Sequence, residues 1–273
     1  MRLPGNTRLF SLNWGKKVRV PGFTRKIWEL FGSTAEKRAD YLWKLYLRTG
    51  TMRCNGDYLD IGCASGQNAI AFGQDCQRIH CLDIDNENVM ECRATFRLKS
   101  ISNVSFYQGD AQALPFKDST FDLISMFSVI EHIPEQHLAI QEASRVLKPG
   151  GQIILQVPNK YFFVDLHTGI PFLHCLPLKT RRWLLTKLWY RQVSDVAGIR
   201  VLSRGELTNL IQTKFAKVHV LKVIYPSELI MPQLKPVYFA FNLFGLFKLV
   251  PFGFLFVADK ATDGSASLNR KSK

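Results

Sequence analysis

The sequence predicts an α/β fold in which a mostly parallel sheet is covered by helices on both faces. Short apolar runs that suit buried strands alternate with segments of helical apolar spacing. Three of these runs end in a loop that contains a carboxylate, as strands do at the ligand-binding edge of a parallel sheet. A chain of 273 residues is long enough for one large domain of this class with additions.

The first predicted strand leads into a loop, residues 60–66, that contains two glycines four positions apart. The loop lacks the dinucleotide pattern G-x-G-x-x-G, because Ala64 and Gln67 occupy the positions of its second and third glycines. Asp60 would repel a pyrophosphate and attract an ammonium group. The loop therefore favours S-adenosyl-L-methionine, a nucleoside with a positive amine and no phosphate. Its candidate cofactor-binding residues are Asp60, Gly62, Cys63, Ala64 and Gly66.

The second strand, residues 79–82, ends in Asp83 and Ile84, about twenty residues after the glycine loop. Asp83 can accept hydrogen bonds from both hydroxyls of a ribose, and Ile84 offers an apolar surface to adenine. Asp85 has a different predicted role, that of a carboxylate at the start of a helix, since Asn86 and Glu87 follow it.

The third strand, residues 104–107, delivers Asp110 and Ala111 to the same edge of the sheet. Asp110 can accept a hydrogen bond from the exocyclic amine of adenine, while the Ala111 N–H can donate to a ring nitrogen. A simple turn is the alternative for Gly109 and Asp110.

The fourth strand, residues 121–126, continues its apolar character into Phe127, which is a further candidate cofactor contact. Glu131 and His132 follow it, where a transferred group should lie, and are the candidate catalytic residues. His132 is the candidate general base, because an imidazole titrates near neutral pH. Two alternatives stay open: either side chain caps the next helix, or the acceptor is only positioned and no base is used.

Four blocks of sequence over residues 57–160 resemble the class I S-adenosylmethionine-dependent methyltransferases, in the group that includes the quinone-biosynthesis enzymes. The blocks are LDIGCASGQNAIAFG, CLDIDNENV, GDAQALPFKDSTFDLISMFSVIEHI and EASRVLKPGGQIILQVPNK. The resemblance implies a seven-stranded Rossmann-like sheet, parallel except for an antiparallel last strand formed by residues 254–258. It also implies that the cofactor lies across strands one, two and four. Ala64 departs from the family, which most often has glycine there.

A long aromatic and proline-rich segment follows the fifth strand, and such segments are commonly functional. Asp165 and His167 are its candidate substrate-binding residues, with plain packing as the alternative. No metal site is expected. The two histidines of this segment have no third soft ligand at a usable spacing, and the cysteines are scattered along the sequence.

The net charge of +14 is unevenly placed, since residues 1–28 contain no acidic residue. A second basic cluster, residues 179–191, is interleaved with aromatic residues. Such surfaces suit an anionic membrane, an anionic substrate or, less favourably without a recognised module, nucleic acid. The phenylalanine-rich stretch at residues 236–258 is interrupted by Lys248 and Pro251, so it is too short to span a bilayer. An apolar helix at the bilayer interface, or one that covers an acceptor pocket, fits better.

The six cysteines show no disulfide framework, which predicts a reducing, cytoplasmic location. The predicted organisation of the chain has five parts. The parts are a basic segment with a helix covering the cofactor site (1–52), the cofactor-binding core (53–160), an inserted acceptor or lid segment (161–202), the completion of the sheet with an apolar helix (203–260) and a disordered tail (261–273). We therefore expect a methyltransferase that acts on a small or lipid-like acceptor, at oxygen. An RNA methyltransferase and a non-catalytic binding module of the same fold are the alternatives. The pattern does not indicate an oligomeric state.

Overall fold

The computed structural model describes most of the chain, including nearly all of the predicted core. The described residues are 10–12, 16–18, 35–50, 54–162, 172–177, 179–181, 183–184, 199–229 and 235–262. The substrate-binding candidates Asp165 and His167, most of the basic N-terminal segment and most of the tail lie outside these residues.

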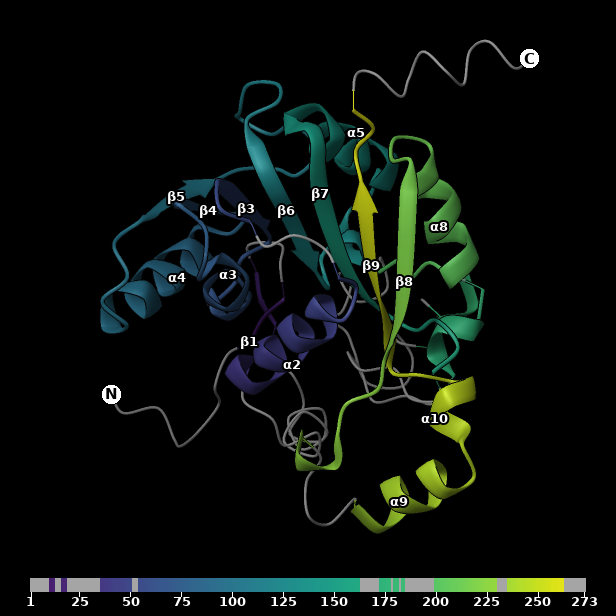
Figure 1. Cartoon of the computed structure of the whole chain (residues 1–273). Coiled ribbons are helices and arrows are strands. Elements are labelled where there is room, and N and C mark those ends of the chain that lie inside the picture. The colour runs from purple at the N-terminus through teal and green to yellow at the C-terminus, as the bar shows by residue number, and fades with distance from the viewer. Residues whose placement is uncertain are drawn as a thin grey trace, which may run out of the picture.

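A seven-stranded sheet forms the centre of the molecule (Figure 1). Its strands are β3 (Asp57–Ile61), β4 (Arg78–Asp83), β5 (Val104–Gln108), β6 (Phe121–Phe127), β7 (Leu147–Pro158), β8 (Lys217–Val223) and β9 (Gly253–Asp259). Their spatial order is β5-β4-β3-β6-β7-β9-β8, and only β9 runs antiparallel to its neighbours. The predicted fold class, with its antiparallel last strand, is confirmed. A separate two-stranded hairpin contains β1 (Phe10–Leu12) and β2 (Lys16–Val18).

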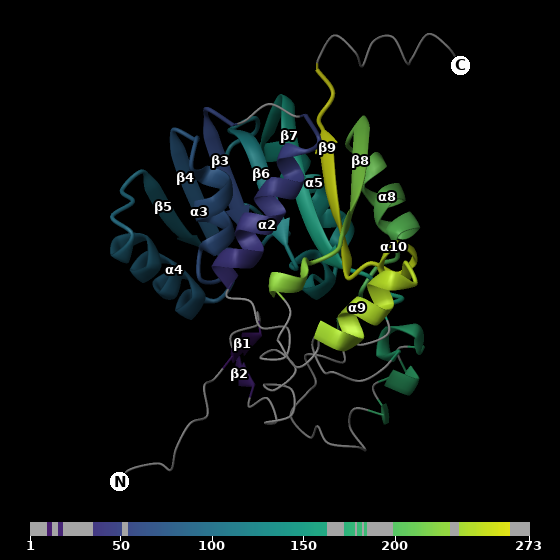
Figure 2. The ribbon, with the colours of Figure 1, turned by 60° about the horizontal axis from the view of Figure 1, so that its bottom comes forward.

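Helices cover both faces of the sheet (Figures 1 and 2). On one face lie α2 (Ala35–Leu47), α3 (Gln67–Gly73) and α4 (Asn86–Leu98); on the other lie α5 (Gln136–Val146) and α8 (Arg204–Gln212). Three short 3₁₀ turns are η1 (Ile130–His132), η2 (Leu173–Cys175) and η3 (Ser227–Leu229), and the helices α9 (Lys235–Leu243) and α10 (Leu246–Leu249) precede β9. The predicted amino-terminal helix is therefore present, and it packs on α3 through Trp43 and Phe72, whose ring centroids are 5.2 Å apart.

The alternation of side chains along β3 assigns its residues to the two cores. Leu59 and Ile61 belong to the core beneath α5 and α8, whereas Tyr58 belongs to the core beneath α2, α3 and α4. Asp60 lies between Leu59 and Ile61, so its side chain points to the α3 side of the sheet. This assignment decides which polar side chains can reach a ligand at the strand ends.

Side-chain hydrogen bonds cap the starts of two helices, one of which, at Asp85, is predicted from the sequence. The Asp85 side chain accepts a hydrogen bond from the Glu87 N–H at the start of α4, as its predicted helix-start role requires. At α8, the Ser203 hydroxyl accepts from the Glu206 N–H while the Glu206 carboxylate accepts from the Ser203 N–H. These bonds to Ser203 lower the pKa of Glu206 to about 2.

Among the residues that the structure describes, no helix combines the length and the apolar character needed to cross a bilayer.

Candidate functional site

An open pocket of about 410 Å³, counting the space that communicates with solvent, lies at the carboxyl edge of the parallel strands. The pocket is lined by Ile61, Gly62, Leu82, Asp83, Ile84, Gly109, Asp110, Ala111, Gln112, Val129, His132, Ile133 and Pro134. The carboxyl edge is where open parallel sheets bind their ligands. Predicted residues from four separate parts of the sequence therefore meet at one cavity.

A second hollow, of about 640 Å³ on the same measure, lies at the opposite edge of the sheet. Its wall includes the ion pair between Lys148 Nζ and Asp122 Oδ2, which are 2.7 Å apart. Asp122 also accepts a hydrogen bond from the Asp57 N–H, so its carboxylate ties together the amino ends of two strands. The hollow is larger, but its charged groups already serve the fold, and we take the carboxyl-edge pocket as the candidate site.

Asp83 is held on the pocket wall by three hydrogen bonds. One of its oxygens accepts from the Ala64 N–H at 3.0 Å, and the other accepts from the Asp85 N–H at 3.0 Å and from Asn88 Nδ2 at 3.2 Å. Only 1% of the residue is exposed, and this burial raises its pKa although the three hydrogen bonds oppose the rise. Asp83 therefore fixes the glycine loop against the start of α4 while facing the pocket.

Asp110 is held by the residue two positions after it. The Gln112 N–H donates to Asp110 Oδ1, and Gln112 Nε2 lies 3.1 and 3.0 Å from the two carboxylate oxygens. Because a carboxylate oxygen can accept more than one hydrogen bond, this arrangement orients Asp110 without using all of its capacity. Ala111 and Ile84 add apolar surface beside it.

The glycine loop adopts left-handed backbone conformations. Gly62 has φ +72°, and a Cβ atom there would lie 2.3 Å from a methyl group of Val129. Gly66 has φ +83°, and a Cβ atom there would lie 2.7 Å from Cys92 Sγ. Ala64, where the family most often has glycine, is also left-handed at φ +45°. The loop thus needs both glycines for space and carries conformational strain at the alanine.

Asp60 is placed differently from the expectation that it faces a ligand. The residue is 1% exposed, is not part of the pocket wall, and accepts a hydrogen bond from Ser125 Oγ at 2.5 Å. Its other oxygen has no hydrogen-bond partner among the described residues. Burial raises the pKa of Asp60 to about 8, so in this structure it is mostly neutral at pH 7. A contact between its charge and an ammonium group stays a prediction.

The two catalytic candidates lie in η1 but face different surroundings. His132 is on the pocket wall. Glu131 is 2% exposed, is absent from that wall, and its carbonyl oxygen accepts a hydrogen bond from the Arg200 N–H. The structure therefore brings His132, but not Glu131, to the same cavity as Asp83 and Asp110.

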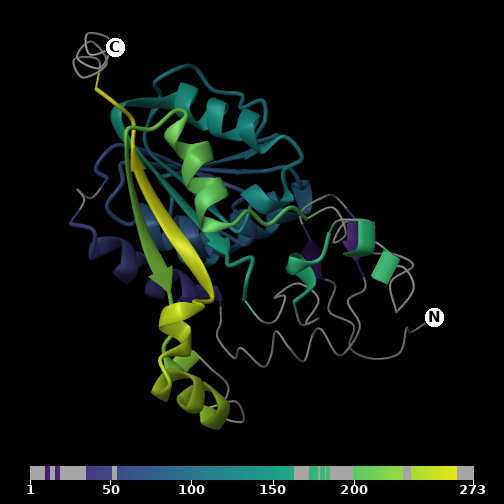
Figure 3. The ribbon, with the colours of Figure 1, turned by 90° about the vertical axis from the view of Figure 1, so that its right-hand side faces the viewer.

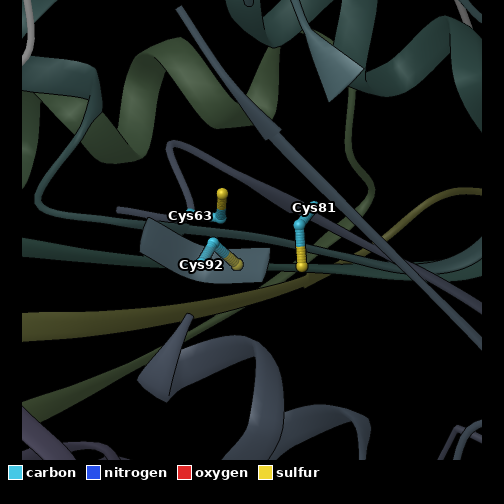
Figure 4. A group of neighbouring side chains, drawn as sticks. All are labelled: Cys63, Cys81 and Cys92. Atoms are coloured by element: carbon cyan, nitrogen blue, oxygen red, sulfur yellow. The ribbon is translucent and has the colours of Figure 1, made fainter. Parts of the chain in front are cut away.

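Three cysteines meet beneath the glycine loop, which corrects the premise that the cysteines are scattered. The Sγ atoms of Cys63, Cys81 and Cys92 all lie within 4.8 Å of one another (Figure 4). Hydrogen bonds from the other two thiols lower the pKa of Cys92 to about 5. Three sulfur atoms at this spacing are a ligand set that could hold a thiophilic ion. Since all three are buried, they also fill the core as small apolar side chains.

The remaining loop and strand candidates lie off the wall of the pocket. Cys63 and Phe127 belong to the core on the α3 side, where the ring centroids of Phe127 and Phe72 are 4.7 Å apart. Ala64 and Gly66 shape the loop without lining the cavity. Their predicted contacts with a cofactor remain predictions.

Several residues on the wall were not predicted from the sequence. Gln112, Val129, Ile133 and Pro134 line the pocket, as do the strand-end residues Ile61 and Leu82. A signal for the last two was available, since each is the apolar residue nearest the carboxyl end of a predicted strand. The others lie in loops whose path depends on backbone turns such as Ser128, which has φ +54°.

Comparisons with known proteins agree with this geometry. Residues 59–155 match the model of the family described as "Methyltransferase domain". A protein named probable S-adenosylmethionine-dependent methyltransferase, from Mycolicibacterium smegmatis, is 34% identical over 112 residues, which are 41% of this chain and 42% of that protein. Demethylmenaquinone methyltransferase of Staphylococcus aureus is 32% identical over 99 residues, which are 35% of this chain and 40% of that protein. The chain spans less than half the length of these curated relatives.

Among solved structures, the [4+2]-cyclase SpnF superimposes with a TM-score of 0.58 and 20% sequence identity over 85% of each chain. A likeness at this identity shows the fold and no more. It agrees with the strand order of the sheet, and the resemblance to class I methyltransferases is confirmed by the family model.

Replacement of Ala64 by glycine should stabilise the protein. The left-handed backbone conformation at residue 64 costs about 1–2 kcal/mol when the residue is alanine, and glycine relieves this strain. Glycine also has more conformational freedom in the unfolded chain, which offsets part of the gain. We expect Ala64→Gly to raise the free energy of unfolding by about 0.5–1 kcal/mol, measured by urea unfolding. The matched control is Ala94→Gly on the exposed side of α4, which should lower it by about 1 kcal/mol. A loss of stability in both variants would contradict the strain at Ala64.

The buried Asp60 carboxyl should make stability depend on pH. Its pKa is about 8 in the folded protein, against 3.8 for an unperturbed aspartate, so the folded state holds a proton that the unfolded state releases between these values. Stability should therefore fall as pH rises from about 4 to 8, by at most about 1.4 kcal/mol per pH unit from this group. Asp60→Asn keeps an acceptor for Ser125 but removes the titration. In thermal unfolding from pH 4 to 8, the stability of the variant relative to the wild type should rise with pH. A difference in stability that stays constant over this range would contradict the raised pKa of Asp60.

Proposed function

We propose that this chain, which matches the family described as "Methyltransferase domain" over residues 59–155, is a class I enzyme that transfers the methyl group of S-adenosylmethionine to a small-molecule acceptor. The observation that supports it most is the pocket at the carboxyl edge of β3, β4 and β6, in which Asp83, Asp110 and His132 share one cavity. The family match supports the reaction class, and the lining of the pocket supports the choice of residues.

The donor set of the pocket fits this cofactor. Two carboxylates, Asp83 and Asp110, suit a ligand that presents hydroxyl and amine donors. Leu82, Ile84 and Ala111 form an apolar wall that suits a purine ring. The loop at residues 60–66 lacks the G-x-G-x-x-G pattern that binds a pyrophosphate, which disfavours NAD-like ligands. We therefore infer that Asp83 holds the ribose hydroxyls and that Asp110 holds the adenine amine.

When bound, S-adenosylmethionine supplies an electrophilic methyl group with its own leaving group. The protein must then bind the acceptor, align its nucleophilic atom, exclude water and, for a hydroxyl acceptor, remove one proton. His132 is the titratable side chain on the wall that can accept this proton near neutral pH. Val129, Ile133 and the proline beside it contribute apolar surface on the same side.

We further propose that the acceptor is lipid-like and that it is methylated at oxygen. One relative acts, by its name, on demethylmenaquinone. The apolar lining near His132 suits an acceptor with an apolar part. All six cysteines lie in the described part of the chain and are free thiols, which supports a cytoplasmic location.

Loss of the Asp83 carboxylate should abolish most cofactor binding. A hydrogen bond to a charged group contributes about 1.5–3 kcal/mol, so Asp83→Ala should weaken binding of S-adenosylmethionine by about tenfold or more in calorimetry. The control Asp75→Ala removes an exposed carboxylate just before the amino end of β4 and should bind as the wild type does. Thermal unfolding must show both variants folded. Undiminished binding by folded Asp83→Ala would contradict the assignment of the ribose site.

Incubation with methyl-labelled cofactor and fractionated cell extract should place the label in the lipid fraction rather than in total RNA. The apolar acceptor wall and the quinone-modifying relative are the reasons for this expectation. Label in RNA alone would favour the RNA-modifying alternative and contradict the lipid-like acceptor.

The same assay tests His132 through its pH profile. His132→Gln keeps a polar side chain but cannot take up a proton, so transfer should be slowest relative to the wild type near neutral pH, by about a hundredfold. The deficit should shrink at high pH, where a hydroxyl acceptor ionises without help. An equal rate in both proteins across the pH range would dismiss a role in proton transfer.

A further inference from the structure

The pair of helices α9 and α10 packs on the protein through an aromatic cluster. Tyr238 stacks on Phe247 with ring centroids 5.1 Å apart, and Phe247 stacks on Phe252 at 4.9 Å. Phe162, which follows the carboxyl end of β7, completes the cluster with Phe252 at 4.7 Å. The inner face of the helix pair is therefore aromatic, and the hydrogen bond from the Tyr238 hydroxyl to the Tyr225 carbonyl oxygen also holds it in place.

The outer face of the same helices is apolar as well. Leu243, Phe244 and Leu249 are 82%, 75% and 76% exposed, and Phe239 is 54% exposed. A helix on the surface of a water-soluble domain normally presents polar residues on the side away from the core. Single exposed apolar residues are ordinary, but large ones gathered on one short helical segment indicate a contact surface.

The charge around this surface favours an anionic partner. The sequence contains no acidic residue from position 229 to position 258, while Lys235 and Lys248 lie within that interval. Lys222 approaches the same segment from β8, where its Nζ donates to the carbonyl oxygen of Lys248. The whole chain carries a net charge of +14. Exposed leucine and phenylalanine beside lysine, on helices that themselves contain no acidic residue, are the composition of helices that lie in a bilayer interface.

The position of the helices relates them to the candidate site. α10 ends just before β9, and the first residue of β9, Gly253, pairs with Pro158 at the carboxyl end of β7. The helix pair therefore projects from the same end of the sheet as the pocket (Figures 1 and 3). A surface bound there would lie at the same end of the sheet as the pocket.

We propose that the outer face of α9 and α10 docks onto the surface of a phospholipid bilayer that contains anionic lipids. Leu243, Phe244 and Leu249 enter the boundary between headgroups and acyl chains, and Lys235 and Lys248 lie among the headgroup phosphates. The helices lie in the plane of the interface, since α9 has nine residues and a span needs about twenty. The reason for such docking rests on the proposed lipid-like acceptor, but docking itself requires no cofactor.

Flotation of the full chain with vesicles tests the docking separately from methyl transfer. The chain should float with vesicles of phosphatidylcholine mixed with phosphatidylglycerol, more weakly with phosphatidylcholine alone, and more weakly as salt is raised. The double variant Leu243→Glu with Phe244→Glu should bind the mixed vesicles at least about tenfold more weakly. The matched control is Leu98→Glu, which changes a leucine that is 87% exposed at the end of α4, at the opposite edge of the sheet.

Three outcomes would overturn the proposal. One is absence of flotation with either vesicle, and a second is equal loss of binding in the double variant and in Leu98→Glu. The third is a wild-type dimer that the double variant converts to a monomer without any vesicle binding, since the face would then be a contact between two copies. Thermal unfolding confirms that each variant is folded. If the chain binds the cofactor but no vesicles, the docking proposal fails and the proposed reaction is unaffected. If it binds vesicles but no cofactor, the proposed reaction fails and the docking proposal is unaffected.

Discussion

The carboxylate of Asp83 is the interaction on which the candidate site depends. It accepts one hydrogen bond from the glycine loop at Ala64 and two from the start of α4, so it joins the carboxyl ends of two neighbouring strands. Burying a carboxylate is costly, and these three donors offset much of that cost. The same group faces the pocket. The loop, the helix start and the ligand wall therefore share one residue, and none of the three can change its geometry alone.

Much of this arrangement could be predicted from the sequence, because it depends on local patterns. Apolar runs mark the strands, and the caps at Asp85 and Ser203 use donors only two or three residues away. Asp60 shows what local reasoning leaves out. Its position beside two glycines predicts a ligand contact, which stays a prediction, but not that the alternation of β3 turns its side chain toward Ser125 on the α3 side. This orientation follows from the alternation of β3, because Ile61 points to the opposite face of the sheet.

Contacts between distant segments were harder to predict. Cys63, Cys81 and Cys92 meet only because β3 pairs with β4 and α4 folds back over both. Their spacing in the sequence contains no sign of this. Likewise, Val129 reaches the pocket because the chain turns sharply after β6, where its methyl groups fill the space left by Gly62. The pocket and the apolar helix pair also come from separate stretches of sequence. They lie at the same end of the sheet only once its strands have paired.

The central claim is that the pocket binds a nucleoside with an amine and without phosphate. Calorimetry of the unmodified chain with S-adenosylhomocysteine and, in parallel, with NAD tests it most directly. The two ligands share adenine and ribose and differ in what is attached to the ribose. We expect saturable binding of S-adenosylhomocysteine and none of NAD, because the loop at residues 60–66 lacks the G-x-G-x-x-G pattern that binds a pyrophosphate. Binding of NAD with equal or higher affinity, or no binding of S-adenosylhomocysteine, would contradict the account.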